Sequence, residues 1–147
     1  PDNGLRKLSL GVNGAYTYTR AKVPQATDPT GSQLEGAAPW IVNADLSYLF
    51  RKGTKSLSTA LVFNYFSDRI YTIGTQGYQD IVENGIPTLD FIASTQLGKY
   101  FSISVKARNL LNSTHQLTRK GNADNKEVVL SKYKRGMDFS IGLSCNF

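Results

Sequence analysis

The sequence predicts an all-β fold: an antiparallel, up-and-down segment of a transmembrane β-barrel with about six long strands, long outer loops and short periplasmic turns. Three observations support this prediction. Apolar and polar residues alternate over long stretches, which places one kind of residue on each face of a strand. Long and short connections follow each other in turn. No apolar run approaches the ~18 residues of a transmembrane helix, although 40% of the residues are hydrophobic.

The carboxyl-terminal stretch, Lys132 to Phe147, has the clearest alternation. Seven of its eight odd positions are apolar, and its even positions are small or polar throughout. Strands in soluble proteins usually have about five or six residues, whereas this stretch is long enough to cross a bilayer at a steep tilt. We therefore expect one continuous closing strand.

Five earlier stretches alternate in the same way. They are residues 8–18, 40–50, 57–65, 89–97 and 101–108. The longer connections, at about residues 21–37, 64–87 and 112–131, have no apolar period and contain the Gly, Pro and Asn residues typical of loops. The resulting plan has six strands joined by three long and two short connections.

The two short connections predict two hairpins with a defined register. A two-residue turn at Gly53 and Thr54 pairs Phe50 with Leu57, which lie on the same apolar face. A three-residue loop from Gly98 to Tyr100 pairs Leu97 with Phe101 in the same way. Because tight turns lie on the periplasmic side of outer-membrane barrels, we expect these four apolar residues at the periplasmic rim.

The polar face carries charged side chains in mid-strand. These are Asp45, Asp90, Lys106, Arg108 and Asp138. Each would cost several kcal/mol in a packed core unless paired, but little against a hydrated lumen or a polar plug. The alternative is a soluble β-sheet with a structural or adhesive role that binds a partner, a non-enzymatic protein whose apolar face is a core. Detergent dependence separates the two interpretations.

Several motifs carry a resemblance to a known family. Ser140, Gly142, Cys145 and Phe147 fall on the positions of the assembly signal of outer-membrane β-barrels, with Cys145 where an aromatic or large aliphatic residue is commoner. Residues 107–112 (ARNLLN) resemble a segment that closes the penultimate strand of TonB-dependent outer-membrane receptors, and residues 36–50 (GAAPWIVNADLSYLF) resemble a recurrent strand of that family.

This resemblance implies a location and a set of partners. Residues 1–147 would form the carboxyl-terminal part of one barrel domain of about 22 strands, as a piece of a longer chain in which plug and energy-coupling box lie elsewhere. The protein would be a multi-pass β-barrel of the bacterial cell outer membrane. Its partners would be the lipid bilayer, the barrel assembly machinery, the plug domain and the TonB energising complex. The implied activity is uptake of a scarce nutrient such as an iron chelate, cobalamin or an oligosaccharide.

Other chemistry has little support in the sequence. The chain carries a formal net charge of +6, but its basic residues form no stripe with interleaved aromatics, so we expect no nucleic-acid partner. His115, Ser113 and Asp124 could form a hydrolase triad only if the fold aligned them; a single loop histidine is usually solvated. We expect no catalytic residues, no cofactor and no metal site.

One outer loop carries residue types that stack on and hydrogen-bond sugars or chelates. They are Tyr71, Gln76, Tyr78 and Asp80, and we name them as candidate contacts to an unknown small-molecule or glycan substrate. Loops at a protein surface are commonly rich in such residues without binding anything, and that interpretation stays open.

Overall fold

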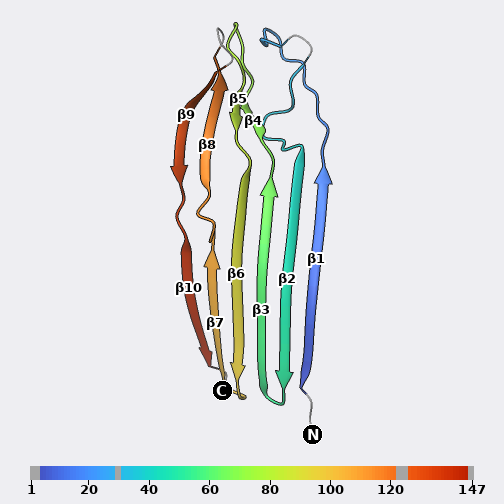
Figure 1. Cartoon of the computed structure of the whole chain (residues 1–147), viewed down its shortest axis with the longest axis vertical. Coiled ribbons are helices and arrows are strands. Elements are labelled where there is room, and N and C mark those ends of the chain that lie inside the picture. The colour runs from blue at the N-terminus through green and yellow to red at the C-terminus, as the bar shows by residue number, and fades with distance from the viewer. Residues whose placement is uncertain (1–3, 29–30, 122–125, 146–147) are drawn as a thin grey trace.

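The computed structural model describes residues 4–28, 31–121 and 126–145, and they form two antiparallel sheets. The larger sheet has the strand order β1-β2-β3-β6-β7-β10. Its strands are β1 (Leu5–Tyr16), β2 (Trp40–Lys52), β3 (Lys55–Phe66), β6 (Ile86–Leu97), β7 (Phe101–Arg108) and β10 (Asp138–Cys145). The sheet is open, with β1 and β10 as its edges (Figure 1). These six strands correspond to the six expected from the alternation.

A smaller sheet continues the hairpins beyond one end of the larger one. Its strands are β4 (Arg69–Thr72), β5 (Ile81–Glu83), β8 (Thr114–Lys120) and β9 (Glu127–Lys134), in the order β4-β5-β8-β9. The described residues therefore contain ten strands, and the prediction of about six was wrong. β4, β5 and β8 lie inside segments predicted as loops, and β9 begins in such a segment and ends within the predicted closing strand. β4 and β5 have only four and three residues, too few alternating positions to give a period.

Both predicted hairpins are confirmed. Phe50 pairs with Leu57 across a turn centred on Gly53, whose φ of 58° lies in the left-handed region that glycine adopts readily. Leu97 pairs with Phe101 across the second turn, where Gly98 has a φ of 80°. Figure 1 shows both turns at the end opposite the smaller sheet.

The register keeps apolar residues in rows across all six strands of the larger sheet. One row crosses the middle of the sheet and reads Leu10, Leu46, Leu61, Phe91, Ala107 and Phe139. Paired residues share a face, so these side chains form a single apolar surface. It is uncovered: Leu10 is 72% exposed and Ile141, one row away, is 75% exposed. The alternation seen along each strand therefore extends across the sheet.

The opposite face is polar along the same strands. Asp45 and Asp90 both pair with Val62, which lies between them, and Gly11 pairs with Asp45 on its other side. A Cβ atom at Gly11 would come within 2.3 Å of Asp45 Oδ1, so the carboxylate occupies the space left by the glycine. Carboxylates in mid-strand thus remain accessible on this face.

The expected continuous closing strand is wrong, because residues 135–137 divide it into β9 and β10. Gly136 has a φ of 85°, and its carbonyl accepts a hydrogen bond from Asn109 Nδ2 at 2.7 Å. β9 then pairs with β8 and β10 pairs with β7. Odd positions remain mainly apolar in the sequence on both sides of this three-residue break, so the sequence pattern gives no sign of it.

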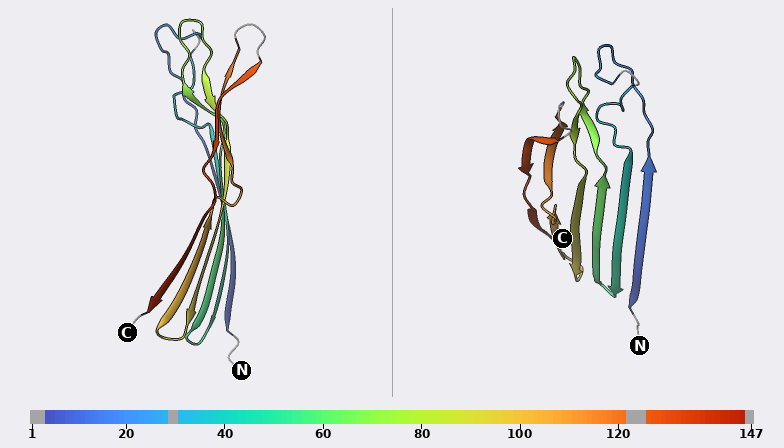
Figure 2. Two further views of the ribbon diagram at one scale, coloured as in Figure 1. Left: turned by 90° about the vertical axis from the view of Figure 1, so that its left-hand side faces the viewer. Right: turned by 45° about the horizontal axis from the view of Figure 1, so that its top comes forward.

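The molecule has almost no interior. Ala38, Ile70, Ile86 and Ala107 are the buried hydrophobic residues within the described ranges. Figure 2 shows the larger sheet as a single twisted layer that narrows at the junction with the smaller sheet and the long loops. No helix in the described part of the chain is long and apolar enough to cross a membrane.

Candidate functional site

Two cavities flank the smaller sheet, on its opposite faces. Alternation along β4, β5 and β8 sends Arg69, Glu83 and His115 to one face. It sends Val82 and Thr118 to the other. The first set lines a cavity of about 570 Å³, which we call the junction cavity, and the second set lines one of about 360 Å³, which we call the outer cavity.

The junction cavity lies where the two sheets meet, on the polar side of the larger sheet. Thr88, Arg108 and Asp138 reach it from the polar face of β6, β7 and β10. Arg135 and Gly136 contribute from the break between β9 and β10. Strands that are far apart in the chain therefore combine into one cavity lined by charged and polar side chains.

An ion pair organises one wall of the junction cavity. Arg69 and Glu83 are cross-strand partners in β4 and β5. Arg69 Nη2 lies 2.6 Å from Glu83 Oε2, and Arg69 Nε donates to the same oxygen at 2.7 Å. The guanidinium also lies over the Phe66 ring, 5.0 Å from its centroid. These contacts fix the Arg69 head group and partly neutralise Glu83.

His115 lies next to Glu83 in the same wall of the junction cavity. It is only 9% exposed and stacks on Tyr133, its partner in β9, with ring centroids 4.9 Å apart and planes 9° apart. Its Nδ1 lies 3.7 Å from Glu83 Oε1 and has no hydrogen-bond partner among the described groups. The expectation of a solvated loop histidine was wrong, because residues 114–120 form a strand whose pairing buries the ring.

Of the possible hydrolase triad, the structure describes Ser113 and His115. Ser113 donates its hydroxyl hydrogen bond to the carbonyl of Pro87. Asp124 lies outside the described residues. The serine hydroxyl is thus engaged with the backbone of β6.

Asn109 closes the cavity at the end of β7. It has a φ of 53°, and its backbone N–H donates to Asp90 Oδ1 at 2.9 Å. Its side-chain Nδ2 bonds the carbonyl of Gly136, which leaves Oδ1 buried without a partner among the described groups. Buried polar atoms are usually hydrogen-bonded. Asn109 Oδ1 and His115 Nδ1 are therefore two buried polar atoms of cavity-lining residues that no described group satisfies.

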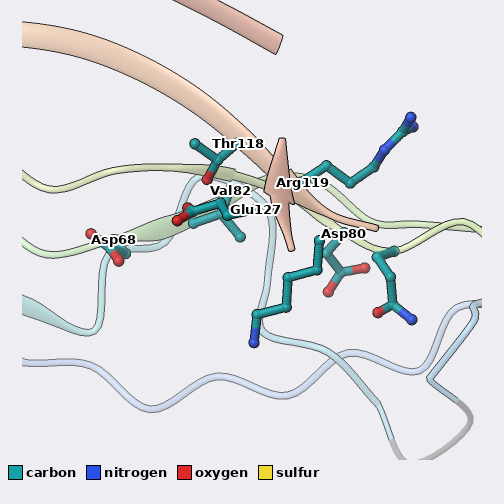
Figure 3. Close-up of a pocket in the computed structure, with 8 residues that line it drawn as sticks. Asp68, Asp80, Val82, Thr118, Arg119 and Glu127 are labelled. Atoms are coloured by element: carbon teal, nitrogen blue, oxygen red, sulfur yellow. The ribbon is translucent and has the colours of Figure 1, made fainter. Parts of the chain in front are cut away.

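The outer cavity is lined mainly by charged residues. Figure 3 shows Asp68, Asp80 and Glu127 around it, with the Arg119 side chain extending away from Asp68 and Glu127. The Arg119 guanidinium lies over the Tyr78 ring, 5.4 Å from its centroid. Thr118 is 2% exposed and donates to Asn84 Oδ1 at 3.1 Å, so it is a structural residue of the cavity wall.

The structure places the four predicted ligand contacts separately. Asp80 lines the outer cavity, but its Oδ1 accepts from Gly74 N at 2.7 Å and its Oδ2 from Ser32 Oγ at 3.2 Å, which joins two long loops. The Tyr78 ring lies beneath the guanidinium of Arg119. Tyr71 is 56% exposed on β4. Gln76 has a φ of 55° and donates its backbone N–H to the carbonyl of Gln25.

Sequence reasoning did not name the residues of the junction cavity as a site. Arg69 and Glu83 stood in a predicted loop, and Asn109 was noted only for its place in a motif. One signal was present: Arg108 and Asp138 are charged residues on the polar face close to strand ends. No group of three or more His, Cys, Asp or Glu suited to a metal ion occurs among the residues that the structure describes.

Three positions of the predicted assembly signal lie on the edge strand β10. Ser140 pairs with Lys106, Gly142 with Ser104, and Cys145 with Phe101. Cys145 is exposed and forms no disulfide within the described residues. The fourth position, Phe147, lies outside the described residues.

A comparison with protein families gives one match, and it covers most of the chain. Residues 3–110 match the family described as "TonB dependent receptor-like, beta-barrel". No curated protein and no solved structure matches the chain. The match spans the first five strands of the larger sheet, β1, β2, β3, β6 and β7, and the members of this family are outer-membrane receptors that act in transport. The chain belongs to the TonB-dependent receptor family, within its β-barrel domain.

Proposed function

We propose that this chain is part of an active transporter of the outer membrane, a receptor that takes up a scarce nutrient such as an iron chelate, cobalamin or an oligosaccharide. The observation that carries the proposal is the register of the larger sheet, which keeps one face apolar and the other polar across six strands. The apolar face suits the acyl chains of the bilayer, and the polar face suits a barrel interior that holds a plug domain.

The position of the junction cavity supports a role in substrate passage. It opens on the polar face, next to the smaller sheet, at the end opposite the tight turns. Long loops of outer-membrane barrels lie on the cell exterior, so a substrate arriving from outside meets this cavity before the strands below it. We propose Arg108 and Arg135 as its contact residues, because both line the cavity and are exposed.

The transport activity is tested in cells that lack the gene and in the same cells with the gene restored. Uptake of labelled iron chelates, cobalamin and oligosaccharides is measured with and without an uncoupler of the proton gradient. We expect uptake of one of these nutrients to depend on both the gene and the gradient, because the TonB complex drives transport. Unchanged uptake of every nutrient, or uptake that persists without the gradient, would contradict the proposal.

The contribution of the junction cavity is tested with Arg108→Gln and a matched control, Arg51→Gln. Both arginines project from the polar face of the larger sheet, but Arg51 lies at the tight-turn end. We expect Arg108→Gln to raise the substrate concentration for half-maximal uptake and Arg51→Gln to leave it unchanged. Equal effects of the two substitutions would exclude a specific role for the cavity.

A further inference from the structure

At the tight-turn end of the larger sheet, the residues that the structure describes include basic side chains and no acidic ones. Residues 4–10, 46–60 and 94–105 converge there and contain no Asp or Glu. The cations are Arg6, Lys7, Arg51, Lys52, Lys55 and Lys99. None of the six makes an ion pair within the described residues. This rim therefore has a positive charge that its own side chains leave uncompensated.

Three of these cations project from the apolar face. Arg6 pairs with Phe50, and its guanidinium lies over that ring, 5.7 Å from the centroid. Lys52 and Lys55 follow Phe50 and Leu57 at the next positions on the same face. Arg6, Lys52 and Lys55, which we call the basic triad, thus border the last apolar row of the sheet. Lys7 and Arg51 alternate with them and project from the opposite face.

The arrangement within the triad is unfavourable without an anion. Lys52 and Lys55 are direct cross-strand partners, and like charges in that relation destabilise a sheet. A bound anion between them removes this repulsion.

Gly4 leaves the flank of the triad open. A Cβ atom at this position would lie 3.0 Å from Lys52 Cβ and 3.2 Å from Phe50 Cε2. A larger residue would therefore cover the stem of Lys52 and the Phe50 ring. With glycine, the ring and the charged groups are reachable from the same side of the sheet.

We propose that Arg6, Lys52 and Lys55 bind the head group of an anionic phospholipid in the periplasmic leaflet of the outer membrane. The tight turns of an outer-membrane barrel lie at that leaflet. The phosphate lies against the triad, and the acyl chains run along the apolar face past Phe50 and Leu57. Basic residues at a membrane surface attract anionic lipids in this way, with a contribution that corresponds to about a fivefold change in affinity for each charge.

The test uses the receptor as its gene encodes it, purified in detergent and titrated with phosphatidylglycerol. Native mass spectrometry gives the Kd, and phosphatidylcholine of the same chain length is the uncharged comparison. We expect tighter binding of phosphatidylglycerol, and a Kd raised about thirtyfold by the double substitution Lys52→Gln/Lys55→Gln. The matched control, Lys7→Gln/Arg51→Gln, removes the same charge from the opposite face at the same end of the sheet and should leave the Kd unchanged.

Two further measurements, one on a variant that keeps the charge and one with inorganic phosphate as competitor, separate the possible causes of a change in the Kd. Lys52→Arg/Lys55→Arg keeps the charge and should keep the affinity, which separates loss of binding from loss of folding. Inorganic phosphate at millimolar concentration should not displace the lipid, because it lacks acyl chains. Equal weakening by both Gln doubles, no preference over phosphatidylcholine, or displacement by phosphate would each overturn the proposal. Nutrient uptake is measured separately, so failure of the lipid-binding proposal does not contradict the transport proposal.

Discussion

An arginine scan at neighbouring positions of the larger sheet tests the assignment of its two faces. Leu61 lies in the central apolar row, 38% exposed, and Val62 lies beside it on the polar face between Asp45 and Asp90. Leu61 is six residues from the first residue of β3. At about 3.3 Å per residue and a tilt of about 45°, this places Leu61 about 14 Å from the rim, close to the middle of an apolar band ~25 Å tall.

The expected cost differs sharply between these positions. Leu61→Arg should destabilise the folded barrel by about 2–4 kcal/mol, the cost of a cation at the bilayer midplane. Leu97→Arg, on the same face beside a tight turn, should cost about 0–1 kcal/mol because the guanidinium reaches the interface. Val62→Arg places the cation between two carboxylates, so we expect it to be neutral or stabilising.

The assay is urea titration of the full-length receptor folded into phospholipid vesicles, with the folded fraction read from heat-dependent gel mobility. A gradient of cost from Leu61 to Leu97 indicates lipid contact. In a packed protein core both leucines are apolar contacts and no depth gradient is expected. Equal costs at Leu61 and Leu97, or a cost at Val62 equal to that at Leu61, would refute the reasoning.

Three other predictions concern pairing, turn geometry and the ion pair. Gly142→Val should weaken the pairing of β7 with β10, because a Cβ there would lie 2.7 Å from Ser104 Oγ; barrel assembly yield in cells measures it, and a normal yield would contradict the packing described. Gly53→Ala should cost about 1 kcal/mol in the urea assay, since nothing lies within 4 Å of the added Cβ and only the positive φ opposes it; no cost would mean that the turn relaxes. A double-mutant cycle of Arg69→Met and Glu83→Gln should give a coupling of about 0.5–1 kcal/mol, as for partly exposed ion pairs, and zero coupling would show that the contact contributes nothing.

The larger sheet could be predicted because its signals are local and redundant. Alternation gave the faces of each strand, and the parity of the two short turns then fixed two registers without further information. Phe50 and Leu57 share a face because the turn has two residues, whereas a three-residue turn would have placed them on opposite faces. Such constraints act within about twenty residues and can be read directly from the chain.

The smaller sheet could not be predicted, because its strands are short and its stability comes from long-range pairing. β5 has three residues and pairs with β8, more than thirty residues later. Its charged residues, Arg69 and Glu83 among them, resemble those of a surface loop until the pairing is known. His115 was misplaced for the same reason, since only the contact with Tyr133 shows that its ring is buried.

The sequence did not predict the junction cavity, because it predicted neither the smaller sheet nor the break in the closing strand. Its walls come from the break at Gly136, from the positive φ of Asn109 and from the extra strands. The alternation of residue types in the sequence continues across residues 135–137, so it gave no sign of the interruption there. Of the four residues named as ligand contacts, the structure shows that Asp80 has a structural part, and the binding role of all four stays a prediction.

The bonds of Asp80 have a consequence for surface digestion of the receptor. Its carboxylate joins the first long loop to the second, and isolated bridges join Ala21 to Ser32 and Ala26 to Thr75. A single tryptic cut after Lys22 therefore leaves both new ends attached by backbone hydrogen bonds. The nicked receptor should remain in one piece under mild conditions and separate into two fragments only when denatured.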